Sequence, residues 1–443
     1  MTLWRGTIFN SIRKLPVAHD HRRIARSFFS VSLFLALTKM AAAGKEVAIA
    51  GAYGTGPVID AYVFLFNILI WPGAIVSSVV LTVLIPALMR EGARDGVAAL
   101  RFRKEILGSI ALAGFATALL SFLLMFAFLQ EGASLLPERT SALARQMLPI
   151  LIFILPLSFV ASFLAANLMA NQRHTNSLLE GVPPLFILLV VVLVPWQSVN
   201  QLAWATILGM LAQLVLLSLC QHHGQRLPRF RFSWRAPEWR TLAGGFGIVL
   251  AGQIVASASG VIDQIMVAPL GSGANATLGY ASRLLSLLMA LGATAVARAL
   301  LPILSELDTL DAGRSTRVAS CWTAALFLAG SVTAIIAYFF APLGIRLLFE
   351  RGAFTAQDTA AVTSIFRYGL LQLPFYFAGI VLVQLIASRG AYWILLSSGV
   401  INFATKIVGN LVLIPILGVG GALAATSLMY AISFPTLWFL SRR

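Results

Sequence analysis

The sequence predicts an all-α polytopic membrane protein with about twelve transmembrane helices, arranged as two parallel-repeat six-helix lobes around a central cavity. Three observations lead to this fold class. Apolar residues make up 59% of the chain and charged residues only 11%, whereas soluble domains carry roughly 25% charged residues. Apolar stretches of bilayer length recur along the chain, and landmarks of its first half reappear in the same order in its second half.

The apolar stretches set the number of spans. A transmembrane helix needs about 20 predominantly apolar residues, and short loops rich in Arg, Gly, Pro or Asn separate stretches of this length. The predicted spans are 27–53, 57–88, 105–130, 144–170, 177–197, 200–221, 241–269, 276–304, 318–348, 361–388, 392–415 and 418–440. This content of apolar spans excludes a soluble fold.

Basic residues predict the orientation in the membrane. Of the 32 Lys and Arg, 22 lie on the side of the two termini, and four lie in the opposite loops. The positive-inside rule therefore places both termini in the cytoplasm, as an even number of spans also requires. We interpret the net charge of +16 as a topology signal and an attraction for anionic lipids, and expect no nucleic-acid partner.

Three proline landmarks define an internal repeat. They are separated by 216, 218 and 220 residues, and the pairs are Pro86 with Pro302, Pro156 with Pro374, and Pro195 with Pro415. An offset of six helices preserves orientation, so the halves are parallel repeats with a cavity between them. The predicted units are a basic cytoplasmic segment 1–26, an N-lobe 27–221, a basic cytoplasmic linker 222–240 and a C-lobe 241–443.

Nine ionisable side chains lie inside the predicted spans, where a charge is costly unless it faces a partner or a wet cavity. The cations are Lys39, Lys45, Arg283, Arg298, Arg367 and Lys406, and the anions are Glu46, Asp60 and Asp263. Because a low dielectric strengthens charge-assisted hydrogen bonds, a surplus of cations suits a phosphate or carboxylate ligand. Lys39, Lys45 and Arg283 are the predicted ligand contacts, since they lie well inside spans of both halves.

The charges of the first span have two interpretations. At 100° per residue, Lys39 and Glu46 share one helix face about 10 Å apart, so that one cavity is able to hold both. Alternatively, these charges form structural ion pairs, Lys45 with Glu46 and Arg283 with Asp263.

Other charged residues also allow two interpretations. Asp60 either caps the N-terminus of its own span, where backbone N–H groups are free, or takes part in gating or coupling. For Arg298 and Arg367 we favour side chains that extend toward a membrane interface over ligand contacts.

Short motifs of common enzymes are absent from the sequence, which has no GxxxxGK[ST], HExxH or GxSxG. Cys220 and Cys321 lie in or beside different spans, and the adjacent His222 and His223 are poorly placed to share a metal. The sequence therefore predicts a transporter and no enzyme, with no metal and no cofactor. An ion gradient or the membrane potential is the available energy source.

The most specific motif is LFERGAFTAQD, after the ninth span. It contains Leu348, Phe349, Gly352, Phe354, Thr355 and Asp358. This pattern resembles the LF-x-x-G-x-F-[ST]-x-x-D signature of the MviN/MurJ lipid II flippase family, within the multidrug/oligosaccharidyl-lipid/polysaccharide exporter superfamily.

Three further elements are similar to that family, and the resemblance covers nearly all of the chain from about residue 27. Lys39 and Lys45-Glu46 keep the spacing of the family's Arg, five residues, Arg-Asp pattern. Its DAFF element resembles Asp60-Ala61-Tyr62-Val63, and its YADRL element resembles Tyr280-Ala281-Ser282-Arg283-Leu284.

The resemblance implies a flippase of the bacterial inner membrane, whose basic cavity holds the pyrophosphate of an undecaprenyl-linked glycan and moves it by alternating access. The cargo would be lipid II or an exopolysaccharide repeat unit, with membrane lipids and enzymes of polysaccharide or cell-wall biosynthesis as partners. Carried over, the substrate contacts are Lys39, Lys45 and Arg283, and the gating or charge-pairing residues are Glu46, Asp60 and Asp263.

Departures from the family leave the cargo open. Gly73 and Ala74 stand where the family has two arginines, Ser282 replaces an acid, and the span-one lysines cannot make arginine's planar bidentate contact. Usual members have two more spans, which form a groove for the lipid tail. Some relatives bind sodium in the second lobe, and the resemblance makes Lys406 a candidate coupling site, at which a built-in cation would argue against sodium coupling.

Other functions stay open beside this one. One is a cation-coupled multidrug-type exporter, which the surplus of positive charge disfavours because the substrates of such exporters are often cationic. Another is a non-transporting membrane scaffold. A membrane enzyme acting on polyprenyl phosphates would need catalytic acids or a metal-binding carboxylate cluster, and the loops are short and poor in Asp and Glu.

Overall fold

The computed structural model of the protein describes residues 37–85, 96–130, 135–170, 175–194, 198–221, 233, 238–290 and 312–441. All regular secondary structure in these ranges is helical. The predicted segment 1–26, most of the predicted linker and Arg298 lie outside the described residues.

The first half of the chain contains a helix over residues 37–53 and seven further helices. These are α3 (Pro57–Val79, continued by η1, Val80–Leu84), α5 (Gly96–Phe128), α6 (Glu138–Leu151), α7 (Ile154–Ala170), α8 (Asn176–Leu179), α9 (Val182–Leu193) and α10 (Gln201–Gln221). Pro57 occupies the start of α3, where its missing N–H is not needed and its fixed φ favours the helix.

The second half contains a helix over residues 274–290 and six labelled α-helices. These are α11 (Glu238–Val267, followed by the short η2, Ala268–Leu270), α13 (Ala312–Phe349), α14 (Ala356–Leu370), α15 (Leu373–Ser388), α16 (Tyr392–Leu417) and α17 (Gly420–Leu440).

The membrane-spanning character of the fold is confirmed. In the described part of the chain, eight helices are long and apolar enough to cross a bilayer, and up to ten spans result if each of two bent helix pairs counts as one. These ten correspond to ten of the twelve predicted spans. The other two, 27–53 and 276–304, are described only over 37–53 and up to residue 290, and both described portions are helical.

Two helix pairs bend alike in the two halves. The α6–α7 pair bends by 41° and the α14–α15 pair by 40°. Pro156 lies in the first turn of α7 and Pro374 in the first turn of α15, and proline there removes an N–H that would continue the preceding helix. These are two of the prolines that the sequence repeat aligns, so the repeat has a structural counterpart.

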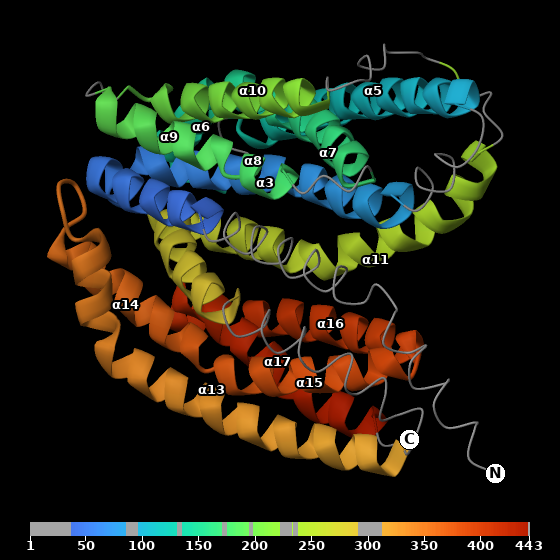
Figure 1. Ribbon diagram of the computed structural model, residues 1–443. Coiled ribbons are helices and arrows are strands. Elements are labelled where there is room, and N and C mark those ends of the chain that lie inside the picture. Colours follow the sequence, from blue (N-terminus) through green and yellow to red (C-terminus); the bar gives the residue numbers. More distant parts are fainter. Residues whose placement is uncertain are drawn as a thin grey trace, which may run out of the picture.

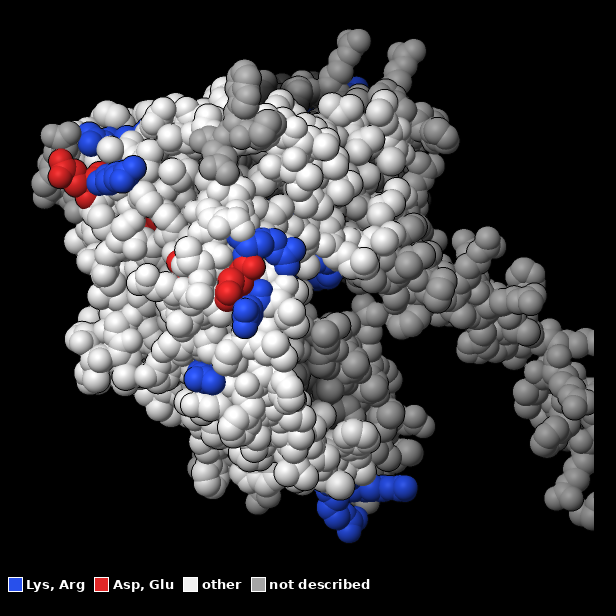
Figure 2. All heavy atoms as spheres, turned by 90° about the vertical axis from the view of Figure 1, so that its left-hand side faces the viewer, with Lys and Arg blue, Asp and Glu red and all other residues white. Residues whose placement is uncertain are grey.

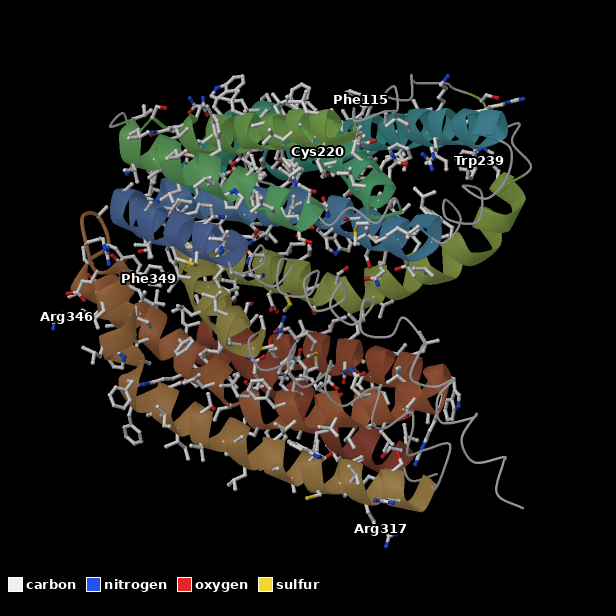
Figure 3. All side chains as sticks on the ribbon, viewed as in Figure 1. Phe115, Cys220, Trp239, Arg317, Arg346 and Phe349 are labelled. Carbon is white, nitrogen blue, oxygen red and sulfur yellow. The ribbon has the colours of Figure 1, made fainter. Side chains whose placement is uncertain are left out.

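The two halves form two groups of helices with α11 between them (Figure 1). Helices α3, α5, α6, α7, α9 and α10 pack among themselves, as do α13 to α17, and α11 contacts both α3 and α16. The outward surface is apolar: Phe115 on α5 and Phe339 on α13 are 58% and 72% exposed. Figure 3 shows Arg317 and Arg346 projecting from opposite ends of α13, so the apolar part of this helix lies between two charged ends.

Candidate functional site

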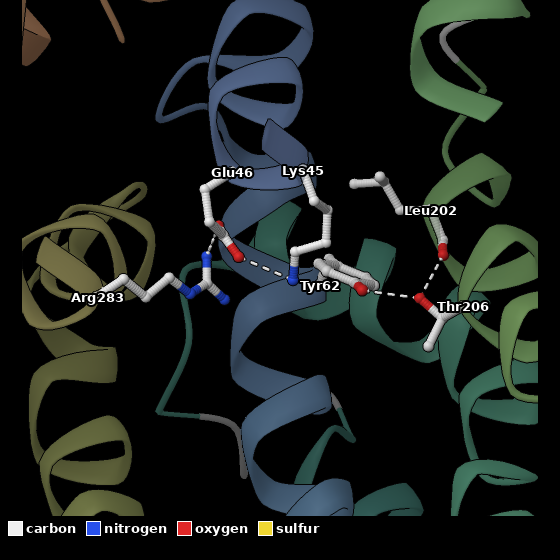
Figure 4. A network of polar contacts seen from close by, with 6 residues as sticks. All are labelled: Lys45, Glu46, Tyr62, Leu202, Thr206 and Arg283. Atoms are coloured by element: carbon white, nitrogen blue, oxygen red, sulfur yellow. Dashed lines mark hydrogen bonds and ion pairs between the residues drawn. The ribbon is translucent and has the colours of Figure 1, made fainter. Parts of the chain in front are cut away.

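Two cationic side chains, one from each half, meet at the carboxylate of Glu46 (Figure 4). Lys45 Nζ lies 2.8 Å from Glu46 Oε1, and Arg283 Nη1 donates to Glu46 Oε2. Lys45 and Glu46 come from the helix over residues 37–53, and Arg283 comes from the helix over residues 274–290. The group carries two positive charges and one negative charge, so it keeps a surplus of positive charge.

The surroundings of this group are aromatic and hydrogen-bonded. Lys45 Nζ lies 5.8 Å from the ring centre of Phe66, which stacks on Tyr62. The Tyr62 hydroxyl and Thr206 Oγ1 are 2.7 Å apart, and Thr206 donates to the Leu202 carbonyl. These contacts fix α3 against α10 directly beside the ion pairs (Figure 4).

The structure separates the predicted site residues of span one. Lys45 is buried, whereas Lys39 is exposed and interacts electrostatically with Glu180. The predicted structural pair of Lys45 with Glu46 is confirmed, but Glu46 also pairs with Arg283. Both carboxylate oxygens of Glu46 have partners, Lys45 and Arg283, and the exposed Lys39 is not one of them.

Asp60 forms a cap, but on another helix than predicted. Its Oδ1 accepts a hydrogen bond of 3.0 Å from the backbone N–H of Ala276, in the first turn of the helix over residues 274–290. The start of its own helix, α3, has no side-chain cap. The prediction of a cap on span two was therefore wrong, and the completely buried carboxylate joins the two halves instead.

Close backbone contacts join the halves at this end of the molecule. The N–H of Ala353 donates to the Gly51 carbonyl at 2.8 Å, and the Tyr280 hydroxyl donates to the Gly54 carbonyl at 3.0 Å. Gly54 and Gly352 have φ of 59° and 57°, a conformation that favours glycine. A Cβ on Gly352 would collide with the Gly51 carbonyl, so the approach requires glycine.

Figure 2 shows the surface of the same end. Some of its charged side chains form small groups in which blue and red lie together, other blue side chains lie apart from red, and most of the described surface is white. This view of the end therefore shows no large patch of one sign.

The LFERGAFTAQD motif forms one side of this contact. The Tyr280 ring packs against Phe349 and Phe354, with ring centres 5.4 and 5.6 Å away. Thr355 and Asp358 form a capping box that starts α14. Asp358 also accepts a hydrogen bond from Thr55 of the first half. The motif thus closes one end of the protein and does not contribute to the charged group itself.

Lys406 and Asp263 form a second buried ion pair. Lys406 Nζ lies 2.8 Å from Asp263 Oδ1 and donates to the Ala422 carbonyl at 2.6 Å and to Thr426 Oγ1 at 2.5 Å. Asn410 donates to the same carboxylate oxygen at 2.7 Å. The predicted alternative pair of Arg283 with Asp263 was therefore wrong, since each has another partner.

Gly73, at which the family would have an arginine, lies buried on the face of α3 toward α7. A Cβ at this position would lie 2.9 Å from Ser158 Cβ, so the helix packing leaves no room for a long side chain here. The absence of this arginine thus agrees with how α3 packs in this protein.

Several residues that take part in these contacts were missed in the sequence. Thr55 stands between two glycines in a turn, and this Gly-Thr-Gly pattern was the available signal. Asn410 and Lys406 are four residues apart on α16, which places them on one face. The N–H of Ala276, which donates to Asp60, and the carbonyl of Gly51, which accepts from Ala353, belong to the backbone, so the sequence contained no signal for them.

The family model and the similar sequences agree on one family. The family model for the lipid II flippase MurJ matches residues 49–443. A probable lipid II flippase MurJ of Bdellovibrio bacteriovorus is 29% identical over 191 residues, which cover 40% of this chain and 35% of that protein. A probable lipid II flippase MurJ of Rhizobium tropici is 27% identical over 377 residues, covering 74% of this chain and 64% of that protein. The chain thus spans less than two thirds of these relatives.

Solved structures with the same fold include a lipid II flippase MurJ in an inward closed conformation, with a TM-score of 0.82 and 18% identity over 94% of this chain and 88% of that chain. A multidrug resistance MATE family transporter in an inward-facing conformation has a TM-score of 0.71 and 16% identity, covering 92% of this chain and 94% of that chain. At these identities the likeness shows the fold alone.

Proposed function

Because this chain belongs to the lipid II flippase MurJ family, we propose that it moves an undecaprenyl-(pyro)phosphate-linked glycan across the bacterial inner membrane by alternating access. The cargo is lipid II or an exopolysaccharide repeat unit. The protein acts as a transporter and not as an enzyme, with membrane lipids and enzymes of cell-wall or polysaccharide biosynthesis as partners.

The observation that carries this proposal is the meeting of Lys45 and Arg283 on Glu46, where the two halves contact each other. A pyrophosphate offers several anionic oxygens in place of the two that Glu46 offers. Charge-assisted hydrogen bonds are short and strong, so the headgroup competes with Glu46 for both cations. Lys39, which is exposed on the same helix, provides the first contact for the approaching headgroup.

Exchange of Glu46 for a headgroup couples binding to movement. The Glu46–Arg283 pair is one of the ties between the halves, and its loss on binding weakens their attachment. Arg283 shares its helix with Ala276 and Tyr280, which hold the closed end through Asp60 and Gly54. A shift of this helix therefore changes the ligand site and the closed end together, as gating by Glu46 and Asp60 requires.

The predicted units complete the proposal. We propose that residues 27–221 and 241–443 act as the two moving lobes, that residues 1–26 and 222–240 lie on the cytoplasmic side, and that both termini are cytoplasmic. The distribution of Lys and Arg supports this orientation.

Lys406 is the proposed counterpart of a coupling cation. Three oxygen atoms, of Asp263, Ala422 and Thr426, surround its ammonium group within 2.8 Å. A cation that is covalently attached does not exchange with the solution, so we propose that the transport cycle does not depend on sodium at this site. The membrane potential or another gradient then supplies the energy.

Transport by purified protein in proteoliposomes tests the proposal. Fluorescent undecaprenyl-pyrophosphate-linked sugar should cross wild-type vesicles faster than empty vesicles, and Lys45→Ala and Arg283→Ala should each slow the crossing at least tenfold. Arg317→Ala is the matched control, because Arg317 is an exposed cation far from the site (Figure 3). Equal rates in wild-type and empty vesicles, or full activity of both site variants, would contradict the proposal.

A further inference from the structure

Arg367 differs from Lys45, Arg283 and Lys406, the buried or half-buried span cations that form ion pairs. Lys45 and Arg283 have Glu46, and Lys406 has Asp263. In the described ranges, no carboxylate lies within ion-pair distance of Arg367. Its Nε donates to the Tyr338 carbonyl at 3.3 Å, and its guanidinium lies 4.4 Å from the centre of the Tyr338 ring. A cation in a membrane span is costly unless it faces an anion or water. The Nη groups of Arg367 remain available as hydrogen-bond donors.

The guanidinium lines a pocket of about 570 Å³ between α13 and α14. Hydroxyl groups line the same pocket at Thr359, Thr363 and Ser364. Thr359, Thr363 and Arg367 follow each other at intervals of four residues and so share one face of α14. Thr363 is 5% exposed, and its Oγ1 has no hydrogen-bond partner within the described part of the chain. An unpaired cation and an unused buried hydroxyl thus belong to one pocket.

The pocket opens toward lipid and not toward the contact between the halves. Gly369, on the other side of α14, packs against Leu285 of the helix over residues 274–290. The walls on the pocket side include Tyr338 and Leu371, which are 44% and 59% exposed, and the neighbouring Phe339 is 72% exposed. In a membrane-spanning helix group, these exposed apolar side chains face the acyl chains.

The outer end of the pocket lies near the start of α14, at the depth of the lipid headgroups. Thr359 lies one turn from the start of α14, and Arg367 lies 11 residues from that start, about 16 Å at 1.5 Å per residue. The pocket therefore extends from headgroup level into one leaflet. At its outer end, Glu350 accepts a hydrogen bond from Thr359 and pairs with Arg346, so the charge of Glu350 is compensated.

We infer that this pocket binds the phosphate of a membrane phospholipid. The Arg367 guanidinium supplies charge-assisted donors to the phosphate oxygens, and Thr363 and Ser364 supply hydroxyl donors. The apolar side chains of Pro342 and Leu371 accommodate the beginning of the acyl chains. A lipid is the source of the phosphate because the pocket opens to the lipid-facing surface. This site is separate from the Lys45–Glu46–Arg283 group and does not depend on the proposed cargo.

Native mass spectrometry of the purified full chain tests the inference by titration with phosphatidylglycerol. The wild type should retain one phosphatidylglycerol more than Arg367→Leu, and Thr363→Val should bind this lipid several-fold more weakly. Diacylglycerol, which lacks the phosphate, should not be retained at the site. Inorganic phosphate in excess should not displace the lipid, because it cannot provide the acyl chains.

Two control variants separate binding from folding. Arg317→Leu removes an exposed cation from α13 outside the pocket and should keep the wild-type number of lipids. Arg367→Lys keeps the charge without the planar donor group and should retain the lipid more weakly than the wild type. Equal retention by wild type and Arg367→Leu, equal loss in Arg317→Leu, or displacement by inorganic phosphate would overturn the inference.

Discussion

The carboxylate of Asp60 accepts a hydrogen bond from the backbone N–H of Ala276, 216 residues later in the sequence. A side chain of α3 thereby caps a helix that belongs to the other half of the chain. Free N–H groups at a helix start favour a carboxylate, so this contact stabilises the closed end and also orients the helix that carries Arg283. Asp60 is consequently a tie between the halves, and the proposed movement would have to break it.

Replacement of Asp60 tests this tie. Asp60→Ala removes the acceptor, and loss of an N-terminal cap costs about 0.5–2 kcal/mol, so the closed end should open more often. We expect a cysteine at position 276, in a background without Cys220 and Cys321, to react several-fold faster with a water-soluble maleimide in Asp60→Ala than with Asp60 intact.

Asp60→Asn serves as the control for this experiment, because its side-chain oxygen is still able to accept the hydrogen bond. Its labelling rate should lie between those of the other two proteins. If Asp60→Ala left the labelling rate unchanged, the cap would not contribute to closure.

Glycine at position 352 is required by the backbone contact with Gly51. Its φ of 57° is unfavourable for alanine, by roughly 1–2 kcal/mol, and an added Cβ would also collide with the Gly51 carbonyl. Gly352→Ala should therefore destabilise the closed end and reduce the rate of lipid-linked glycan transport several-fold in proteoliposomes.

Gly344→Ala makes the same chemical change in α13, at a place where an added Cβ meets no described atom within 4 Å. This variant should transport like the wild type and unfold at the same temperature or higher, because alanine favours helix more than glycine does. Equal transport by the two alanine variants would show that closure does not depend on the Gly51–Gly352 approach.

Glu46 is expected to limit the affinity for an anionic ligand. Glu46→Gln keeps the shape of the side chain but removes the charge that occupies Lys45 and Arg283. A pyrophosphate headgroup would then no longer compete with a carboxylate. One charge-assisted hydrogen bond contributes about 1.5–3 kcal/mol, so the affinity for a short-chain polyprenyl pyrophosphate should rise on the order of tenfold or more in equilibrium binding.

The same variant should transport more slowly, since the empty protein lacks the ion pair that restores contact between the halves. Lys45→Ala and Arg283→Ala are the comparison, and both should lower the affinity. Weaker binding of the ligand to Glu46→Gln than to the wild type would contradict the proposed exchange of partners.

Much of the fold followed from the sequence. Ten of the twelve predicted spans have counterparts among the described helices, because the length of an apolar stretch is a local property that the bilayer fixes. The bends of the α6–α7 and α14–α15 pairs were not predicted, although Pro156 and Pro374 marked their places in the repeat. Hydropathy indicates that a segment spans the membrane, but it does not indicate whether the helix is straight or bent.

The partners of the charges were less predictable. Lys45 and Glu46 are neighbours in the chain, and their pairing was one of the two interpretations of the first span. Glu46 and Arg283 are 237 residues apart, and nothing in either local sequence indicates which of several acids a cation meets. Asp60 has a backbone group as its partner, and every residue except proline offers the same N–H, so this contact required the structure.

The environment of Lys406 resembles that of a bound monovalent cation. Its ammonium group is surrounded by oxygen atoms of Asp263, Ala422 and Thr426, and the side chain is 1% exposed. Removal of the ammonium group leaves the buried carboxylate of Asp263 with the Asn410 amide as its described hydrogen-bond partner. Loss of one member of a buried ion pair costs about 3–5 kcal/mol.

Lys406→Met should accordingly lower the thermal unfolding temperature, and sodium ions should restore part of the loss by entering the vacated position beside Asp263. Wild type should unfold at the same temperature in sodium chloride and in choline chloride of equal concentration, because its ammonium group already fills this position and choline is too large for it. The double variant Lys406→Met/Asp263→Asn, which has no carboxylate to compensate, should regain stability without sodium. A Lys406→Met protein whose unfolding temperature is the same in both salts would show that the oxygen atoms around Lys406 do not form a cation site.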